Sequence, residues 1–340
     1  MAIPIWQDHY ITLGSGSQYD YRIVLDDLSE VIYTGRAYLR PSASEVRVKV
    51  NDILADYLST ALPSMDDSDF TRLSFPLSFT IQYDDDGVWT DAETFEVYKN
   101  WSYEYEFDPA VSGLSAPING RASAVMPFVM SVWEADSVRM NVYYKDGTSS
   151  FRIVPIATQE NFSDDFSDDF ALSLQSAGSG SICFDLSRWD NVDHIEVGGH
   201  TFKVVDGCSA RYGLYYENAY GGWDFLVCDS RPGVMRDELT RHTFEKDYDN
   251  NDPSQGAKDN YCNEIARHLV LRTGWLTDDE ASRMHHLLNS TSVYVYDTMD
   301  GTMRPVVITD NTTEYKRSKE QGSPVMYTIN CEYSAIMTRR

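Results

Sequence analysis

Two groups of side chains in this sequence have residue types that could bind a metal ion. The adjacent pair His285-His286 supplies two imidazoles, but neighbouring helix positions point about 100° apart, so the rings do not converge. The segment that begins at Asp247 carries acidic and amide side chains at alternate positions, as a calcium loop does. However, Asp252 stands where such a loop needs glycine, and Asp259 follows one residue late. We predict no metal and no cofactor, with a solvated loop as the interpretation and calcium as its alternative.

Carboxylates that could act as a catalytic acid and base are abundant, since the chain has 53 Asp and Glu residues. A glycoside hydrolase needs two of them facing each other across a cleft, and no pair stands out from this background. The sequence lacks a nucleophile elbow, a phosphate-binding loop and a dinucleotide-binding motif. Its five cysteines are scattered without metal-site spacing, which predicts reduced thiols. We therefore predict that the protein is not an enzyme.

An aromatic-glycine cluster suggests binding instead of catalysis. Tyr215, Tyr216, Tyr220 and Trp223 lie around a Gly-Gly pair, and such rings can stack on sugars or form an interface rich in Tyr and Trp. Core packing is the alternative for all four. We take them as candidate binding or interface residues. Strand alternation places Trp223 on the same face as Phe225 and Val227, and we expect that face to be buried, within the module or against a neighbouring subunit.

Composition favours an acidic protein built mainly of strands. The chain has 340 residues, a formal net charge of -25, 42% hydrophobic residues and 13% aromatic residues. Aromatic and β-branched residues favour strands. The negative charge repels phosphate backbones, so we predict no nucleic-acid partner. The first residues lack the basic and apolar regions of a signal peptide, and no segment is apolar enough to span a membrane. We expect no membrane partner and synthesis in a cytoplasm.

The elements that position these residues form three predicted parts. Residues 1–110 are expected to form an N-terminal β-sandwich domain, because short strands alternate with turn signals. Residues 111–206 are expected to form a middle β domain, with an acidic loop at the repeat over residues 162–169. Residues 207–340 are expected to form a C-terminal β-rich module with one helix over about 278–289. The fold class is thus mainly β, with several sandwich or barrel modules.

Local signals support these assignments. Val46, Val48 and Val50 alternate with charged residues, as in a half-buried strand. Turn residues predict hairpins in the segments 79–90 and 138–154, and at the Gly pair 198–199. Thr277 followed by Glu280 forms a capping box, which predicts a helix that begins at this point.

Several segments together resemble tail-region structural proteins of phages and prophages from gut Bacteroidetes. They span about residues 208–340 and are Tyr220-Gly221-Gly222-Trp223-Asp224, Thr273-Gly274-Trp275-Leu276, Met284 to Ser290, Val306-Val307-Ile308-Thr309-Asp310 and Glu314-Tyr315-Lys316. The N-terminal domain fits the same family less sharply. The resemblance implies a virion component near the tail tip or baseplate, similar in role to distal tail proteins. Those proteins form symmetric rings that join the tail tube to receptor-binding parts.

The resemblance also implies where the protein acts and with what. It implies a phage tail protein that is assembled in the bacterial host cytoplasm, with itself and other virion tail proteins as partners. No catalytic residues come with it. Two alternatives remain open on sequence: a glycan-binding or glycan-cleaving tail module, and a bacterial surface adhesin. A glycan binder should expose an aromatic platform, an enzyme should have a cleft with opposed carboxylates, and a ring protein should have large interfaces.

Overall fold

The computed structural model of the chain describes most of its length. The described residues are 2–5, 9–26, 29–41, 43–55, 57–58, 62–72, 77–99, 114–156, 178–205, 211–229, 234–245, 258–310, 325–335 and 337–339. Strands account for 62% of the structure and helices for 7%, which confirms the mainly β class with several antiparallel sheets. The predicted acidic loop of the middle domain, at residues 162–169, lies outside the described residues, as do residues 247–257 of the acidic stretch 247–260. Residues 258–260, which we interpret from the sequence as loop, form the start of a strand.

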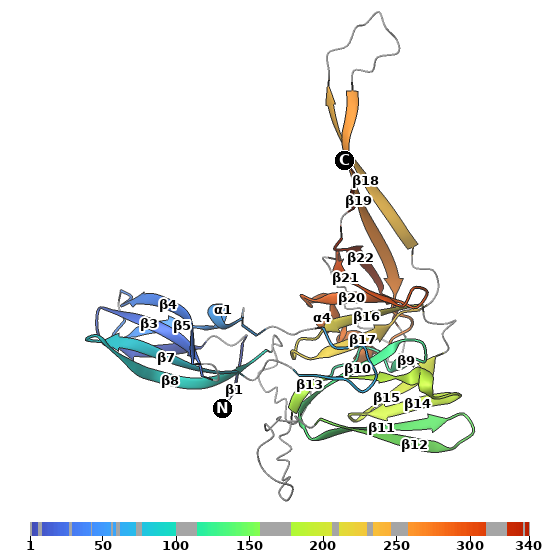
Figure 1. Cartoon of the computed structure of the whole chain (residues 1–340), viewed down its shortest axis with the longest axis horizontal. Helices are drawn as coiled ribbons and strands as arrows, with labels where there is room; N and C mark the ends of the chain where they lie inside the picture. Colours follow the sequence, from blue (N-terminus) through green and yellow to red (C-terminus); the bar gives the residue numbers. More distant parts are fainter. Residues whose placement is uncertain are drawn as a thin grey trace, which may run out of the picture.

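The N-terminal domain packs two sheets against each other, like a sandwich (Figure 1). Its elements are β1 (Ala2–Pro4), β2 (Tyr10–Gly14), β3 (Gln18–Leu25), β4 (Glu30–Tyr38), β5 (Val46–Lys49), α1 (Asn51–Leu54), β7 (Leu77–Asp85) and β8 (Val88–Tyr98). The larger sheet has the order β1-β8-β7-β3-β4, and β2 pairs with β5. Ile23 and Ile81 of the larger sheet share a core with Val46 and Val48 of β5, as the alternation in the sequence predicts.

The middle part contains two further sheets. Its elements are β9 (Arg121–Ser123), β10 (Pro127–Ala135), β11 (Ser137–Tyr144), β12 (Ser149–Pro155), β13 (Gly178–Asp185), the 3-10 helix η1 (Leu186–Arg188), β14 (Val192–Val197) and β15 (His200–Val205). One sheet has the order β12-β11-β14-β15-β9, and both predicted hairpins, β11–β12 and β14–β15, are present in it. The other sheet has the order β10-β13-β6, where β6 (Phe70–Arg72) comes from the N-terminal part of the chain.

The C-terminal module is organised around one large sheet. Its elements are β16 (Tyr212–Glu217), β17 (Trp223–Val227), β18 (Val234–Glu245), β19 (Lys258–Arg272), α3 (Asp278–Ser282), α4 (Met284–Leu288), β20 (Val293–Asp297), β21 (Thr302–Ile308), β22 (Thr328–Tyr333) and β23 (Met337–Arg339). The order is β17-β16-β20-β21-β22-β19-β18, and β23 pairs with β19. The predicted helix over 278–289 is two short helices, since Arg283 interrupts it. The capping box of Thr277 and Glu280 is confirmed at its start.

The middle part and the C-terminal module share a core. Trp223, Phe225 and Val227 pack with the buried residues of the middle sheets, whereas Leu226 of the same strand packs in the C-terminal core under α4. Both faces of β17 are therefore buried, as the strand period of two residues requires when a sheet lies between two layers. Residues on both sides of the predicted boundary at 207 thus belong to one folded body.

Candidate assembly surface

The four aromatic residues of the predicted cluster lie inside the molecule. Tyr215, Tyr216 and Trp223 are 1%, 0% and 1% exposed, and Tyr220 is partly buried. The Tyr215 hydroxyl donates a hydrogen bond to the Pro127 carbonyl of the middle part. Of the alternatives that the sequence left open, Tyr215, Tyr216 and Trp223 therefore take core packing within the single chain.

The Gly-Gly pair explains why the cluster packs so tightly. Gly221 has φ +86, which is a left-handed conformation that suits glycine. At Gly222 a Cβ atom would lie 2.5 Å from the Leu114 carbonyl oxygen and 2.7 Å from the Ser131 Cβ. The turn therefore presses directly against the segment 114–120. Neither glycine is placed to leave space for a ligand.

Buried polar groups around Trp223 bind this segment to the C-terminal module. The Asn218 side-chain amide donates to the Leu114 carbonyl and to the Asp224 carboxylate, both at 2.6 Å. The Asp224 carboxylate also accepts from the Ala116 backbone at 2.7 Å. Burial raises the pKa of Asp224 to about 6, although these hydrogen bonds act against the rise. Asp224 is 2% exposed, so this group holds the chain in place and is closed to substrate.

The histidine pair does not form a metal site. His286 is 2% exposed, and its Nδ1 accepts a hydrogen bond from the Ala219 backbone at 3.2 Å. Burial, with a smaller effect from His285, lowers the pKa of His286 to about 3, so it is neutral. His285 lies at the surface, and its Nδ1 contacts the Ser282 carbonyl. Within the described ranges no group of three or more His, Cys, Asp or Glu side chains could hold a metal ion.

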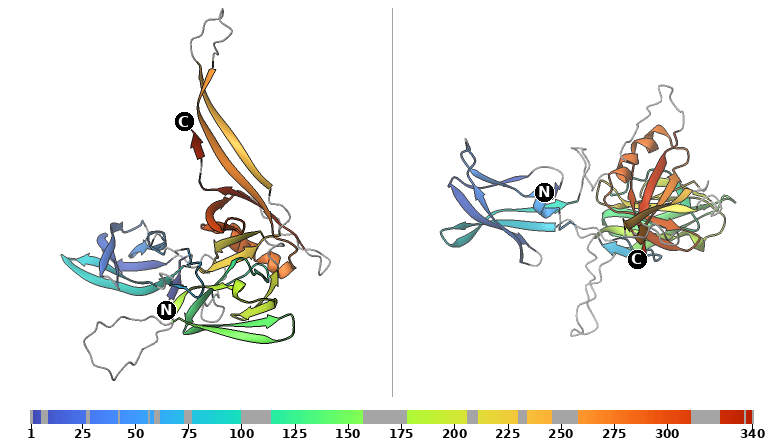
Figure 2. Two further views of the ribbon diagram at one scale, coloured as in Figure 1. Left: turned by 45° about the vertical axis from the view of Figure 1, so that its right-hand side comes forward. Right: turned by 90° about the horizontal axis from the view of Figure 1, so that it is seen from above.

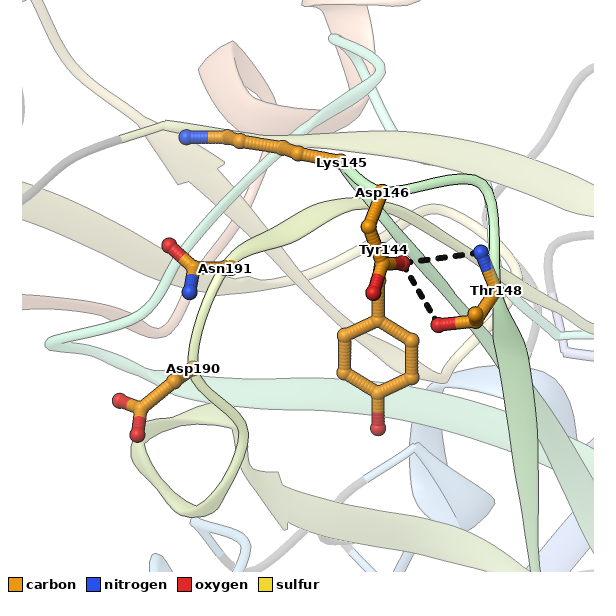
Figure 3. A pocket seen from close by; sticks show the side chains of 6 residues that line it. All are labelled: Tyr144, Lys145, Asp146, Thr148, Asp190 and Asn191. Carbon is orange, nitrogen blue, oxygen red and sulfur yellow. Dashed lines mark hydrogen bonds between the residues drawn. The ribbon is translucent and has the colours of Figure 1, made fainter.

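A shallow hollow of about 480 Å³ lies at one end of the middle sheet (Figure 3). The residues that line it are Tyr144, Lys145, Asp146, Thr148, Asp190 and Asn191. Hydrogen bonds from the Thr148 hydroxyl and backbone occupy Asp146 and lower its pKa. Figure 3 shows Lys145 at the upper edge and Asp190 at the lower edge of the view, so these side chains do not meet at one point. The hollow is formed by two adjoining turns, and its lining residues do not include an acid and a base that face each other.

A two-stranded arm is the feature that the sequence-based prediction missed. We define the arm as β18 and β19, which are 12 and 15 residues long and pair from Val234 with Val270 to Glu245 with Lys258. On its other edge, β19 pairs with β22 through its last residues, His268 to Arg272, and with β23 through Asn263 to Ile265. The arm therefore extends well beyond the body, as Figures 1 and 2 show. The sequence analysis predicts no element at residues 234–245, because the apolar residues of β18 do not alternate.

The arm is electrically neutral in a very acidic chain. Its two strands contain five basic and five acidic residues, whereas the whole chain has a formal net charge of -25. Some of these charges are paired across the strands: Arg267 donates to the Asp237 carboxylate at 2.9 Å on one face. His242 and His268 lie 3.4 and 3.3 Å from Glu264 and Glu238 on the other face. This balance of charge is a signal that the sequence contains and that could have drawn attention to the segment.

One edge of the arm is free to pair. β18 ends the strand order of the sheet, and among the described residues β19 is the strand that pairs with it. Met235, Leu239 and Phe244 of β18 are 43%, 44% and 47% exposed. From Met235 to Arg241 this edge of β18 pairs with no other described strand, and such backbone groups beside exposed apolar side chains are a template for another strand.

Comparisons with known proteins do not identify the chain. No protein-family model matches it, and no curated protein matches it. In the described residues no helix is long and apolar enough to cross a membrane. The features of this chain that bear on its function are therefore the arm and the buried cluster.

Proposed function

We propose that this protein is a structural component of a phage tail, of the distal tail or baseplate type, in a ring or adaptor. It acts by protein–protein assembly and carries out no catalytic step. The projecting arm, with its free β18 edge, is the observation that carries the proposal. A soluble monomer gains little from a long exposed ribbon with apolar side chains, whereas an assembling subunit uses one as a contact.

The charge distribution supports assembly through the arm. Copies that each carry a net charge of -25 repel one another over most of their surfaces. The arm brings no net charge, so neighbouring chains can approach there at the smallest electrostatic cost. Leu239 and Met235 then supply apolar surface, and the β18 edge supplies directional hydrogen bonds.

The predicted partners are other copies of this chain and other tail proteins, and the predicted place is the virion. Closed rings arise when a repeated contact between subunits closes on itself. The glycan-binding alternative loses its main support because Tyr215, Tyr216 and Trp223 are buried in the body. We therefore keep assembly as the single proposed function.

Cryo-electron microscopy of native particles that contain this chain tests the proposal. We expect several copies around the tail axis, each with its arm in contact with a neighbouring protein. Mass spectrometry of purified particles should find the chain among the tail proteins. Absence from the particle, or arms that project freely into solvent in every copy, would contradict the proposed function.

A further inference from the structure

The free edge of β18 is complementary to itself. We propose that a second copy of this chain pairs with it, β18 against β18 in antiparallel orientation, about a twofold axis at Leu239. This inference rests on the proposed role of the arm as the assembly element, and it names the partner of that element. Its source is the order of charges along β18, Arg236-Asp237-Glu238-Leu239-Thr240-Arg241-His242.

Strand geometry limits the possible registers. In an antiparallel pair, directly opposite residues point to the same face of the sheet, and side chains alternate between faces along each strand. A twofold axis between two residues would place residues of opposite faces against each other. The axis must therefore pass through a residue. Each permitted register can thus be named by that central residue.

The register centred on Leu239 matches opposite charges twice. Asp237 then lies opposite the partner's Arg241, and Arg241 lies opposite the partner's Asp237. Leu239 lies opposite its own copy. Opposite-charge and apolar pairs directly across an antiparallel ladder are the stabilising ones.

The neighbouring registers are poorer. Centring the axis on Glu238 places two like carboxylates opposite each other, which is destabilising. Centring it on Thr240 places Leu239 opposite the partner's Arg241 and leaves Asp237 opposite the partner's Thr243. Centring it on Thr243 also sets Arg241 opposite the partner's Glu245 twice, but it overlaps only residues 241–245 of β18 and places no apolar pair across the axis. Opposite charges together with the central apolar pair therefore favour Leu239.

The side chains needed for this contact are accessible in the single chain. Residues 235–241 of β18 are all exposed, and the Asp237 side chain is half exposed while it accepts from Arg267. A second copy would add the partner's Arg241 to that ion pair. Leu239 lies opposite the half-buried Ile265 of β19 on the same face. Two copies would thus combine four apolar side chains in one patch between two ion-pair clusters.

This contact has a consequence for symmetry. A twofold contact uses the same surface on both copies, so it joins chains in pairs and cannot close a ring alone. A ring that closes through other surfaces of the body would then be joined by its arms to a second ring, or contain an even number of copies.

A disulfide test exploits the twofold axis. Leu239→Cys, in a Cys262→Ser background and the full chain, places two thiols directly opposite each other. Opposite Cα atoms in such ladders are about 4.5–5.5 Å apart, within the range that a disulfide spans. We expect covalent dimers under mild oxidation. The control, Thr240→Cys in the same background, places the two thiols diagonally at about 7–8 Å and should form few dimers. Equal dimer yields from the two variants would overturn the proposed register.

A second test changes one charge on β18 in the chain with its native cysteines. Arg241→Asp places Asp opposite Asp at both ends of the contact, and self-association measured by sedimentation should weaken at least tenfold. The control, Arg36→Asp, removes an exposed Arg that pairs with Asp20 in the N-terminal domain, and should leave self-association unchanged. Circular dichroism should show both variants folded. Equal association of the two variants would overturn the pairing.

Covalent dimers from a chain absent from native tails would overturn the proposed function and leave the pairing intact.

Discussion

Trp223 is held by contacts on every side. Its ring packs in the core that the middle sheets share with β17, and it lies 6.0 Å from the Tyr294 ring. Its backbone amide donates to the Ser131 hydroxyl at 2.7 Å, and the same hydroxyl donates to the Trp223 carbonyl. The side chain and the backbone of this one residue therefore join two parts of the chain.

Trp223→Ala should lower the free energy of unfolding by about 3 to 5 kcal/mol, because it leaves a large cavity in a packed core. Chemical denaturation of the full chain measures the loss. The matched control is Trp275→Ala, since Trp275 is 61% exposed in the same module and its replacement should change stability by about 0.5 kcal/mol or less. Similar losses for the two variants would contradict the core position of Trp223.

Asp224 should make stability depend on pH. Its pKa is about 6 in the folded chain against 3.8 for the ordinary group, so the folded protein binds the extra proton between these values. This contribution to stability is fully present below about pH 3.8 and is lost as the pH rises through about 6. The total loss is about 3 kcal/mol at most.

Asp224→Asn isolates this effect, because its amide does not titrate. As the pH rises from 4 to 6.5, the unfolding free energy of the wild type should fall relative to that of the Asp224→Asn variant. His286 acts in the opposite direction, since burial holds its imidazole neutral and its stability contribution falls as the pH drops below 6.5. Because the wild type and the variant both contain His286, its contribution cancels in the difference between their unfolding free energies. Asp190→Asn, in an exposed turn, is the control, and a difference curve for Asp224→Asn that matches the control curve would refute the prediction.

At the scale of elements, short helices depend on their ends. α3 has five residues, so its first turn is most of its length. The Thr277 hydroxyl accepts from the Glu280 amide, while the Glu280 carboxylate accepts from Thr277 at 2.7 Å and from Gly120 at 3.2 Å. The capping box thus fixes both the helix start and the segment 114–120.

Thr277→Ala should lower stability by about 1 kcal/mol, because it leaves an amide at the helix start without its partner. Thermal or chemical unfolding of the full chain measures this loss. Thr277→Ser keeps the hydroxyl and should retain most of the wild-type stability. If Ala and Ser variants unfold alike, the cap does not contribute as proposed.

At the scale of the whole molecule, ion pairs with buried carboxylates connect parts that are distant in sequence. Lys99, after β8 of the N-terminal domain, lies 2.7 Å from the Glu217 carboxylate of β16. Arg152 and Arg188 of the middle part contact Asp67, which precedes β6. Burial alone would raise the pKa of Asp67, but the hydrogen bond and charge of Arg152, with smaller effects from Asp185 and Arg188, lower it overall.

Lys99→Met should destabilise the chain by about 3 to 5 kcal/mol, because it leaves the Glu217 carboxylate buried without its cation. Side-chain exposures of 11% and 4% make this a buried pair. Adding Glu217→Met should recover much of the loss, since no buried charge then remains. The control Lys258→Met breaks a pair whose side chains are 65% and 79% exposed, and should cost about 0 to 1 kcal/mol. A single Lys99 variant as stable as this control would show that the pair does not hold the domains.

Much of the local structure could be predicted from the sequence, because local rules decide it. The alternation of Val46 and Val48, the hairpin turns and the Thr277 cap depend on residues close together in the chain. The mainly β class follows from composition in the same way. The face shared by Trp223, Phe225 and Val227 also follows from the strand period.

Only the tertiary structure decided which surfaces remain accessible. Tyr215, Tyr216 and Trp223 have the composition of a binding platform, yet a sheet from the middle part covers one side and α4 the other. Both faces of β18 reach solvent, so its sequence does not alternate between apolar and polar residues as a half-buried strand does. The pattern of apolar residues therefore does not indicate a strand there. Burial depends on what packs against a strand, and those partners lie far away in the chain. The sequence by itself therefore determined the elements that have a local signal, whereas long-range packing determined that the aromatic cluster is core and that β18 forms one edge of a charge-neutral arm.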